Sequence, residues 1–580
     1  MSKRLYGATV LVALLFSIYL LTSAGKFHIV DEVSLFGVTE SLALRGEVDT
    51  NAIAWTQWVN SPGEVLGAFG RDGQVYSKKG PAPAFLAVPW YLLLLAVTKL
   101  KIGLGLVQGV LLWNGLVTAF TAALLWLTVR RLHYSDWIGI LLALLYGLAT
   151  IAWPYANHFF GEPLSALSLL CCFYGILSYR LTGYFYWILG AGIAAAVAVM
   201  TVVAHTLLVA VLGLYLLTFF VYAPAAVNRD DQTSGEADTT SSEPRSRVKR
   251  ILVASGIYAG PILIAGLLLL WYNTVRFGSP FDTGYHFGSG EGFSTPVLEG
   301  LWGLLLSPYR GVFWHTPLLI VALVAFFPFL RRHPVEGVLI FALSFVLVSL
   351  YSRWWMWWGG FAWGPRFLVP LTPFWLLPLA TPLAAIEARW QQRDPAARLS
   401  SLRALGLSGV LIALFTLLSC VVQLLAVTVN YVNYEIQLRS IFPTNWEDPL
   451  AFGPPALRLR DWAYSPVLGQ WRLLRENFIG NNDLAWVRPD GNLSLLTLVI
   501  GIAAVATLAL LLVSVLHGYR AKTMVADQSL VMGLMALVIP AALVGVWLGQ
   551  SATDPHYGMA GSGYRAVLSG SVRKPRLPML

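Results

Sequence analysis

The sequence predicts an all-α integral membrane protein with about 13 transmembrane helices. Of its 580 residues, 57% are apolar and only 12% are charged. A soluble globular protein carries about a quarter charged residues. Long stretches of the chain hold no charged residue at all, and about 20 apolar residues suffice for a helix to cross a bilayer. These observations exclude a soluble enzyme, and the high hydrophobicity excludes a disordered chain.

The predicted spans follow from the charge-free runs. Lys3 and Arg4 precede the first run, which is too long for the core of a signal peptide and has no clear cleavage site, so it is expected to be a span with a cytoplasmic N-terminus. The run 181–228 is long enough for two helices with a turn near Met200–Val203. In chain order the runs are 5–25, 102–129, 137–157, 163–179, 181–228, 251–275, 311–330, 337–352, 367–386, 404–434, 491–519 and 528–553.

The segment 80–98 is shorter and is interrupted by prolines. We expect a juxtamembrane or re-entrant helix here, inside a large first extracytoplasmic loop, because such a segment survives at membrane depth when it packs on protein. If it does not cross, the turns that remain cytoplasmic are rich in Lys and Arg, as the positive-inside rule requires. This reasoning favours 13 crossings, with the N-terminus inside and the C-terminus outside.

The spans divide the chain into four expected parts. They are an N-terminal transmembrane catalytic module, a flexible cytoplasmic linker, a second transmembrane module and a C-terminal transmembrane region. Their boundaries are 1–228 (first outer loop 26–102), 229–250, 251–403 (outer loops 273–312 and 353–366) and 404–580 (outer segment 429–490).

The cysteines and the net charge limit which cofactors and binding partners the sequence can predict. Cys171, Cys172 and Cys420 all lie in apolar runs, which fits neither a disulfide framework nor a zinc pair. The net charge of +10 suits cytoplasmic anchors and anionic lipid better than nucleic acid. No cofactor is predicted, and a divalent metal is left open without being indicated.

Carboxylates gather in the expected outer segments. Asp31 and Glu32 directly follow the first span and diverge by about 100° on a helix, so one of them can face a pocket as a general base. The alternative is a solvated pair at a span end. Glu162 precedes Pro163, which suits the first turn of a helix, and it is either a second carboxylate of that pocket or a helix-end anion. His158 is close enough in sequence to pair with Glu162.

Basic and aromatic residues lie in the same outer segments. The cations are expected to bind a lipid phosphate. The alternative for the lysines is contact with headgroups, and the alternative for Arg366 is a pair with a carboxylate. The aromatic side chains are expected to stack on a sugar or an acceptor, and the alternative is an interfacial belt. The predicted phosphate ligands are Lys78, Lys79, Arg310 and Arg366, and the predicted stacking residues are Trp354, Trp358, Trp363 and Tyr76.

The order of these motifs resembles a known family. An acidic pair in His28–Glu32 follows the first span, Tyr76-Ser77-Lys78 and a proline-rich turn close the first outer loop, an acid precedes a later span, and Trp363-Gly364-Pro365-Arg366 precedes another. The pattern resembles the GT-C superfamily of polytopic glycosyltransferases, near the protein O-mannosyltransferases and the lipid A aminoarabinose transferase. It departs from the family's usual Pro-Pro pair at Gly80-Pro81-Ala82-Pro83.

The resemblance implies transfer of a sugar from a polyprenyl-phosphate donor to an extracytoplasmic lipid, glycan or protein. Asp31 matches the position of the base, with Glu32 beside it as the other candidate, and Glu162 matches the second acidic position. The implied location is the bacterial plasma membrane, with the active site on its outer face. The alternatives are a transporter or flippase of lipid-linked sugars and a structural subunit. Few ionisable groups lie within the spans, which favours the enzyme.

Overall fold

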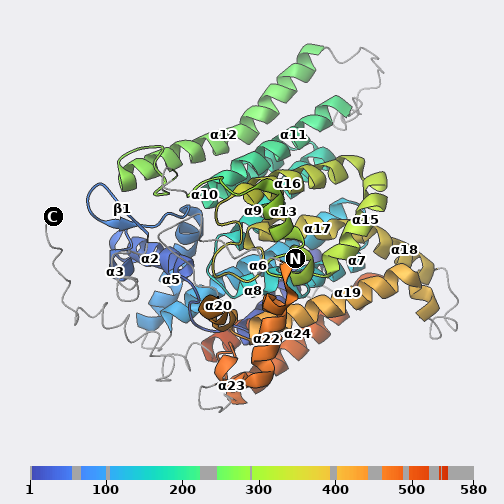
Figure 1. The fold of residues 1–580 in the computed structure, drawn as a ribbon. Helices are drawn as coiled ribbons and strands as arrows, with labels where there is room; N and C mark the ends of the chain where they lie inside the picture. The colour runs from blue at the N-terminus through green and yellow to red at the C-terminus, as the bar shows by residue number, and fades with distance from the viewer. Residues whose placement is uncertain are drawn as a thin grey trace.

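The computed structural model is a bundle of helices (Figure 1). It describes residues 3–54, 67–99, 105–222, 244–285, 287, 291–391, 402–441, 460–487, 495–521, 535–536 and 538–546. Within these residues the sheet structure is one short antiparallel pair, in which Ala68 lies opposite Tyr76 and Phe69 opposite Val75.

The first half of the chain contributes α1, α6, α7, α9, α10 and α11 to the bundle, and α2, α3, β1, β2 and α5 lie between α1 and α6. The bounds are α1 Lys3–Leu21, α2 Val30–Arg45, α3 Asn51–Ala54, β1 Ala68–Phe69, β2 Val75–Tyr76, α5 Ala82–Lys99, α6 Leu106–Arg131, α7 Asp136–Leu148, α8 Ala152–Ala156, α9 Glu162–Thr182, α10 Phe185–Thr201, the 3-10 helix η1 Val203–His205 and α11 Thr206–Tyr222.

The second half alternates long helices with short ones. The bounds are α12 Pro244–Phe277, α13 Val297–Leu305, α14 Val312–His315, α15 Leu318–Arg332, α16 Pro334–Arg353, η3 Arg366–Leu371, α17 Thr372–Leu376, η4 Leu377–Leu379, α18 Ala380–Gln391, α19 Leu402–Thr428, α20 Tyr431–Ile441, η6 Trp462–Tyr464, α22 Pro466–Glu476, α23 Phe478–Asn481 and α24 Leu495–Ala521.

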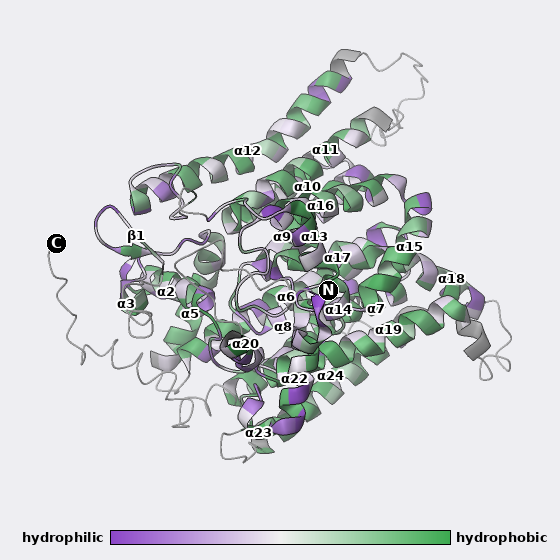
Figure 2. Cartoon of the chain, in the orientation of Figure 1, coloured by the Kyte–Doolittle hydropathy of each residue, from purple (hydrophilic) through white to green (hydrophobic). Residues whose placement is uncertain are grey.

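The protein is an all-α, multi-pass membrane protein. In the described part of the chain, nine helices are long and apolar enough to cross a bilayer, and three further apolar helices are shorter. Hydrophobic residues cover most of the long helices along their whole length (Figure 2). The exact count of 13 crossings stays a prediction.

Several expected segments differ from the helices that form. The run 311–330 is divided between α14 and α15, and the run 367–386 is divided among η3, α17, η4 and α18. The run 137–157 is not one helix: α7 ends at Leu148, and α8 is a separate short helix. The 13 residues of α7 extend about 20 Å, too short to cross the hydrocarbon core alone. Residues 244–250 of the expected linker belong to α12, and the rest of the linker lies outside the described residues. The run 181–228 divides as expected, since α10 ends at Thr201.

Helix ends follow local chemistry. The last turn of α6 holds Arg130 and Arg131, where cations complement the negative end of the helix dipole. The Ser135 hydroxyl accepts a hydrogen bond from the backbone N–H of Ile138 and thereby caps α7. Gly183 ends α9 with a φ of 76°, a conformation that favours glycine.

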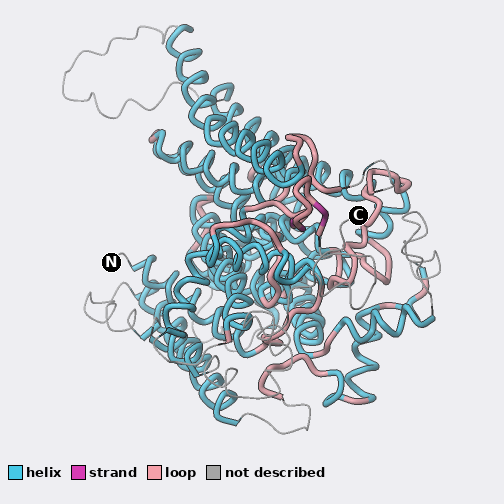
Figure 3. Tube along the Cα trace, turned by 90° about the vertical axis from the view of Figure 1, so that its left-hand side faces the viewer, coloured by secondary structure: helices cyan, strands magenta, loops and turns pink. Residues whose placement is uncertain are grey.

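The core lies where the long helices pack together. Helix α9 packs against α6 and α10, α10 packs against α12, and α1 packs against α6 and α24. Trp126 is fully buried there, and its indole N–H donates to Asp136 at 3.1 Å, so its polar end is satisfied. Most of the described loops gather on the side of the molecule away from the N-terminus (Figure 3).

Gly80 permits a close approach between two segments. A Cβ atom at Gly80 would press against the backbone oxygens of Met200 and Thr201 at the end of α10, closer than van der Waals contact allows. We expect Gly80→Ala to lower the free energy of unfolding by about 1–3 kcal/mol, the usual range for overpacking. Gly190→Ala is the matched control on α10, because nothing lies within 4 Å of its added methyl group. Thermal unfolding in detergent measures both, and equal midpoints would contradict the assigned contact.

Candidate active site

A cavity of about 1100 Å³ lies where several loops meet the helix ends. One side is polar and is lined by the start of α2, the turn before α5, the start of α9 and the start of η3. Apolar residues of longer helices line another part, among them Leu207 of α11, Leu269 of α12 and Leu350 of α16. The cavity can therefore take a ligand with a charged end and an apolar body.

Asp31 is the centre of the polar side. Its Oδ2 atom accepts a hydrogen bond from Nη1 of Arg366 at 2.7 Å and lies 2.9 Å from Nζ of Lys79. Asp31 is in the first turn of α2, Lys79 is in the turn before α5, and Arg366 begins η3. Three segments that are far apart in sequence thus converge on one carboxylate oxygen.

The neighbouring cations decide the charge of Asp31. Burial raises the pKa of the Asp31 carboxyl, but Lys79 and Arg366 lower it by more, so the net pKa lies well below the usual range. Burial likewise lowers the pKa of the Lys79 ammonium, and Asp31 raises it above its usual value. Both groups are therefore charged near neutral pH.

Glu162 faces the same cavity from the start of α9. Its Oε1 atom lies 3.8 Å from Nε of Arg366, beyond hydrogen-bond distance. That Nε is buried and makes no hydrogen bond to the described residues. Arg366 thus lies between the two carboxylates, and the structure brings together Asp31, Glu162, Lys79 and Arg366, four of the residues singled out in the sequence.

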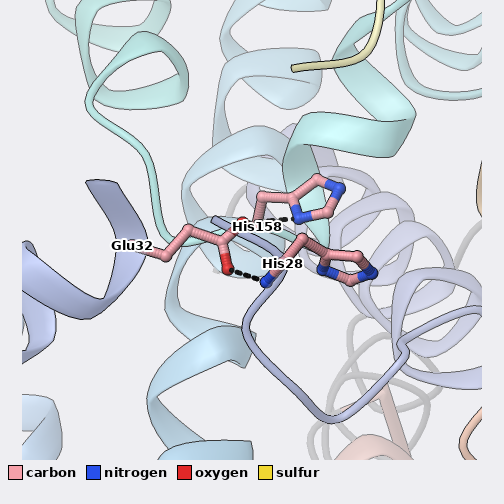
Figure 4. Close-up of side chains that lie close together, drawn as sticks. All are labelled: His28, Glu32 and His158. Atoms are coloured by element: carbon pink, nitrogen blue, oxygen red, sulfur yellow. Dashed lines mark hydrogen bonds and ion pairs between the residues drawn. The ribbon is translucent and has the colours of Figure 1, made fainter. Parts of the chain in front are cut away.

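Glu32 points away from the cavity, as expected for the neighbour of Asp31 on a helix. Its Oε2 accepts the backbone N–H of His28 at 3.2 Å, and its Oε1 lies 2.7 Å from Nδ1 of His158 (Figure 4). His158 therefore contacts Glu32 and not Glu162, the partner its sequence position suggested. Glu32 does not line the cavity.

The two other expected phosphate ligands have separate partners. Lys78 lines the cavity and forms an ion pair with Glu291 at 3.1 Å. Arg310 is buried, pairs with Glu435 at 2.8 Å and donates to the backbone oxygens of Trp358 and Gly360. Arg310 is not among the residues that line the cavity.

Only one of the four expected stacking residues lines the cavity. Trp354 lines the cavity, whereas Tyr76, Trp358 and Trp363 do not. Tyr76 donates its hydroxyl hydrogen to Asp72 at 2.7 Å, and Trp363 is 1% exposed. Stacking on a sugar or acceptor stays a prediction for all four.

Sequence reasoning gave no role to several cavity residues. Arg276 lines the cavity, and its guanidinium donates to the backbone oxygen of Ser77 and to Asn273. Arg276 directly follows a charge-free run, just as Arg366 directly precedes one. Ionisable groups at the ends of spans often face functional cavities, so this position could have identified Arg276 as a candidate. Glu291 and Tyr285 also line the cavity, but they lie in an irregular loop with no distinguishing pattern.

Comparison with known proteins gives matches at the level of structure. No family model and no curated protein matches the sequence. The chain is similar to ArnT from Cupriavidus metallidurans bound to undecaprenyl phosphate, with 15% identity and a TM-score of 0.41 over 99% of this chain and 81% of that one. Apo ArnT from the same organism gives 14% identity and a TM-score of 0.40 over the same shares.

A third similar structure is archaeal. It is the oligosaccharyltransferase AglB from Archaeoglobus fulgidus in complex with an inhibitory peptide and a dolichol-phosphate, with 11% identity and a TM-score of 0.44 over 79% of this chain and 61% of that one. At these values the likeness carries no functional argument, so function is inferred from the residues of the site.

Removing the Arg366 charge tests the cluster. In Arg366→Met, Asp31 keeps one neighbouring cation, Lys79, and Glu162 loses its nearest cation. Breaking a buried pair by removing one partner typically costs about 3–5 kcal/mol, and we expect the low end because Asp31 is 18% exposed. Thermal unfolding in detergent gives the readout, with exposed Arg331→Met as the control. The same midpoint in both variants would show that the ion pairs contribute nothing to stability.

Proposed function

We propose that the protein is a glycosyltransferase that moves a sugar from a polyprenyl-phosphate donor to an extracytoplasmic acceptor. The acceptor is a lipid, a glycan or a protein. One observation carries the proposal: Asp31, Lys79, Arg366 and Glu162 meet on the polar side of a cavity whose other walls come from apolar helices. A lipid-linked donor has the same division into an anionic head and an apolar chain.

The cations suit the donor phosphate. Guanidinium and ammonium groups are the usual phosphate ligands. The Nε atom of Arg366 has a hydrogen to donate and no hydrogen-bond partner among the described residues. A phosphate that takes up Lys79 and Arg366 would compete with Asp31 for both, and Asp31 would then be released toward the acceptor. Lys78 is the further cation at the cavity wall.

The reaction is a single displacement at the anomeric carbon. The acceptor hydroxyl oxygen forms a bond to C1 while the bond from C1 to the phosphate oxygen breaks, and the hydroxyl proton passes to Asp31. The polyprenyl phosphate leaves with the electron pair, and Lys79 and Arg366 stabilise its charge. Attack from the side opposite the leaving group inverts the configuration at C1. Glu162 is placed to orient the sugar or the acceptor through Arg366.

The apolar wall suits the prenyl chain. Leu207 and Leu269 belong to helices that are long and apolar enough to span the bilayer, so a donor confined to the membrane can reach the charged cluster. Trp354 lines the cavity and offers an aromatic face to a sugar ring. We place the site on the outer face of a bacterial plasma membrane, where the positive-inside pattern puts these loops.

Replacing Asp31 tests the base. Asp31→Asn keeps the shape of the side chain and removes its basicity, so we expect turnover to fall about 10²–10⁴-fold, the usual contribution of general-base catalysis. The assay measures polyprenyl phosphate released by purified protein from a panel of polyprenyl-phosphate sugars. Glu47→Gln is the control, because Glu47 is 62% exposed.

Two outcomes would redirect the assignment. Near-normal turnover in Asp31→Asn would contradict the assignment of Asp31 as the base, and Glu32, the other candidate from the sequence, does not line the cavity. If wild-type protein released no polyprenyl phosphate from any donor but moved lipid-linked sugar across liposomes, the protein would be a flippase.

The two neighbouring lysines provide a matched test of phosphate binding. Lys79 contacts Asp31, whereas Lys78 contacts Glu291. Hydrogen bonds to charged groups are worth about 1.5–3 kcal/mol, so we expect Lys79→Gln to weaken polyprenyl-phosphate binding by about 10- to 100-fold and Lys78→Gln to weaken it less. Calorimetric titration in detergent compares the two. A larger loss in Lys78→Gln would contradict the placement of the phosphate beside Asp31.

A further inference from the structure

A second cluster of ionisable side chains lies beside the cavity, and one of its members, His28, lines the cavity wall. His28 precedes α2, Glu32 is in its first turn, and His158 lies between α8 and α9 (Figure 4). One potential ligand atom from each residue lies within 4.8 Å of the other two. Their side chains are 1%, 0% and 6% exposed, respectively. Two segments, the start of α2 with the residues before it and the turn between α8 and α9, therefore bring two buried imidazoles and a buried carboxylate together.

Hydrogen bonding within the described residues leaves this cluster incomplete. The Nδ1 atoms of both histidines and the Oε1 atom of Glu32 are buried and have no hydrogen-bond partner. The contact of 2.7 Å between His158 and Glu32 is close, but its geometry is not that of a hydrogen bond. Buried polar atoms without partners are unfavourable by about 1–3 kcal/mol each. The three atoms point to a missing common partner.

The other nitrogen of His28 is held firmly. Its Nε2 atom lies 2.6 Å from Oδ2 of Asp483, and Oδ1 of Asp483 lies 3.1 Å from Nζ of Lys26. A carboxylate on the far nitrogen orients the ring of a metal-binding histidine and fixes its tautomer, leaving the nearer nitrogen as the ligand. That nearer nitrogen, Nδ1, is the atom of His28 without a partner.

We propose that His28, Glu32 and His158 bind a divalent transition-metal ion, with zinc as the preferred ion. Two imidazole nitrogens and one carboxylate oxygen form a ligand set that zinc favours. At ordinary zinc–ligand lengths, ligand atoms lie about 3.3 Å apart, so small side-chain rotations bring the three atoms into place. The ion joins the start of α2 to the segment between α8 and α9. It thereby fixes the backbone that carries Asp31. This metal site does not depend on the glycosyltransferase proposal.

The first test measures metal in the purified full-length protein. We expect about one zinc ion per chain by mass spectrometry after purification without chelators, and at least a fivefold loss in Glu32→Gln and His158→Ala. His517→Ala is the matched control, because His517 is exposed on α24, away from this cluster. Asp483→Asn removes the orienting carboxylate, and we expect zinc affinity to fall about 10- to 100-fold.

The second test uses wild-type protein, so it does not depend on the folding of a variant. After removal of metal with a chelator, we expect added zinc to raise the thermal unfolding midpoint, and added cobalt(II) to give the visible absorption bands of a low-symmetry nitrogen–oxygen site. Wild-type protein that carries no metal, and whose midpoint does not respond to micromolar zinc, would overturn the proposal. So would zinc retained in full by both Glu32→Gln and His158→Ala. Neither result depends on sugar transfer, so failure here is separate from failure of the proposed function.

Discussion

The ion pairs around Asp31 join four segments that are separate in the sequence. Apolar surroundings make an isolated charge costly, so each charge must keep an opposite partner nearby. Arg366 satisfies this need for Asp31 at 2.7 Å and lies 3.8 Å from Glu162, while Lys79 completes the group. The starts of α2, α9 and η3 and the turn before α5 are thereby tied to one point. The same charges that order the loops are available to an anionic ligand.

Much of the fold follows from the sequence because few backbone structures are stable inside a bilayer. Backbone groups in hydrocarbon must pair within their own segment, so long charge-free runs become helices, and α6, α9 and α16 lie close to where the runs predict them. The break within the run 137–157 has a physical reason. The apolar composition of a segment indicates that it lies in an apolar environment. It does not indicate where the helix ends, and here the helix ends at Leu148.

The site was only partly predictable from the sequence. Asp31, Glu162, Lys79 and Arg366 were identifiable as ionisable groups at helix ends, and they do meet. Which charge pairs with which was not predictable, because periodicity relates only residues a few positions apart. The pairing of Arg310 with Glu435, which keeps that arginine out of the cavity wall, spans 125 residues of sequence.

An experimental structure of the protein with a polyprenyl phosphate bound would show whether Lys79 and Arg366 hold the phosphate. We expect the phosphate between these two cations, with the Asp31 carboxylate moved out of contact with at least one of them and open toward the acceptor side of the cavity. A phosphate bound elsewhere, with Asp31 still paired to both cations, would contradict the proposed role of the ion pairs.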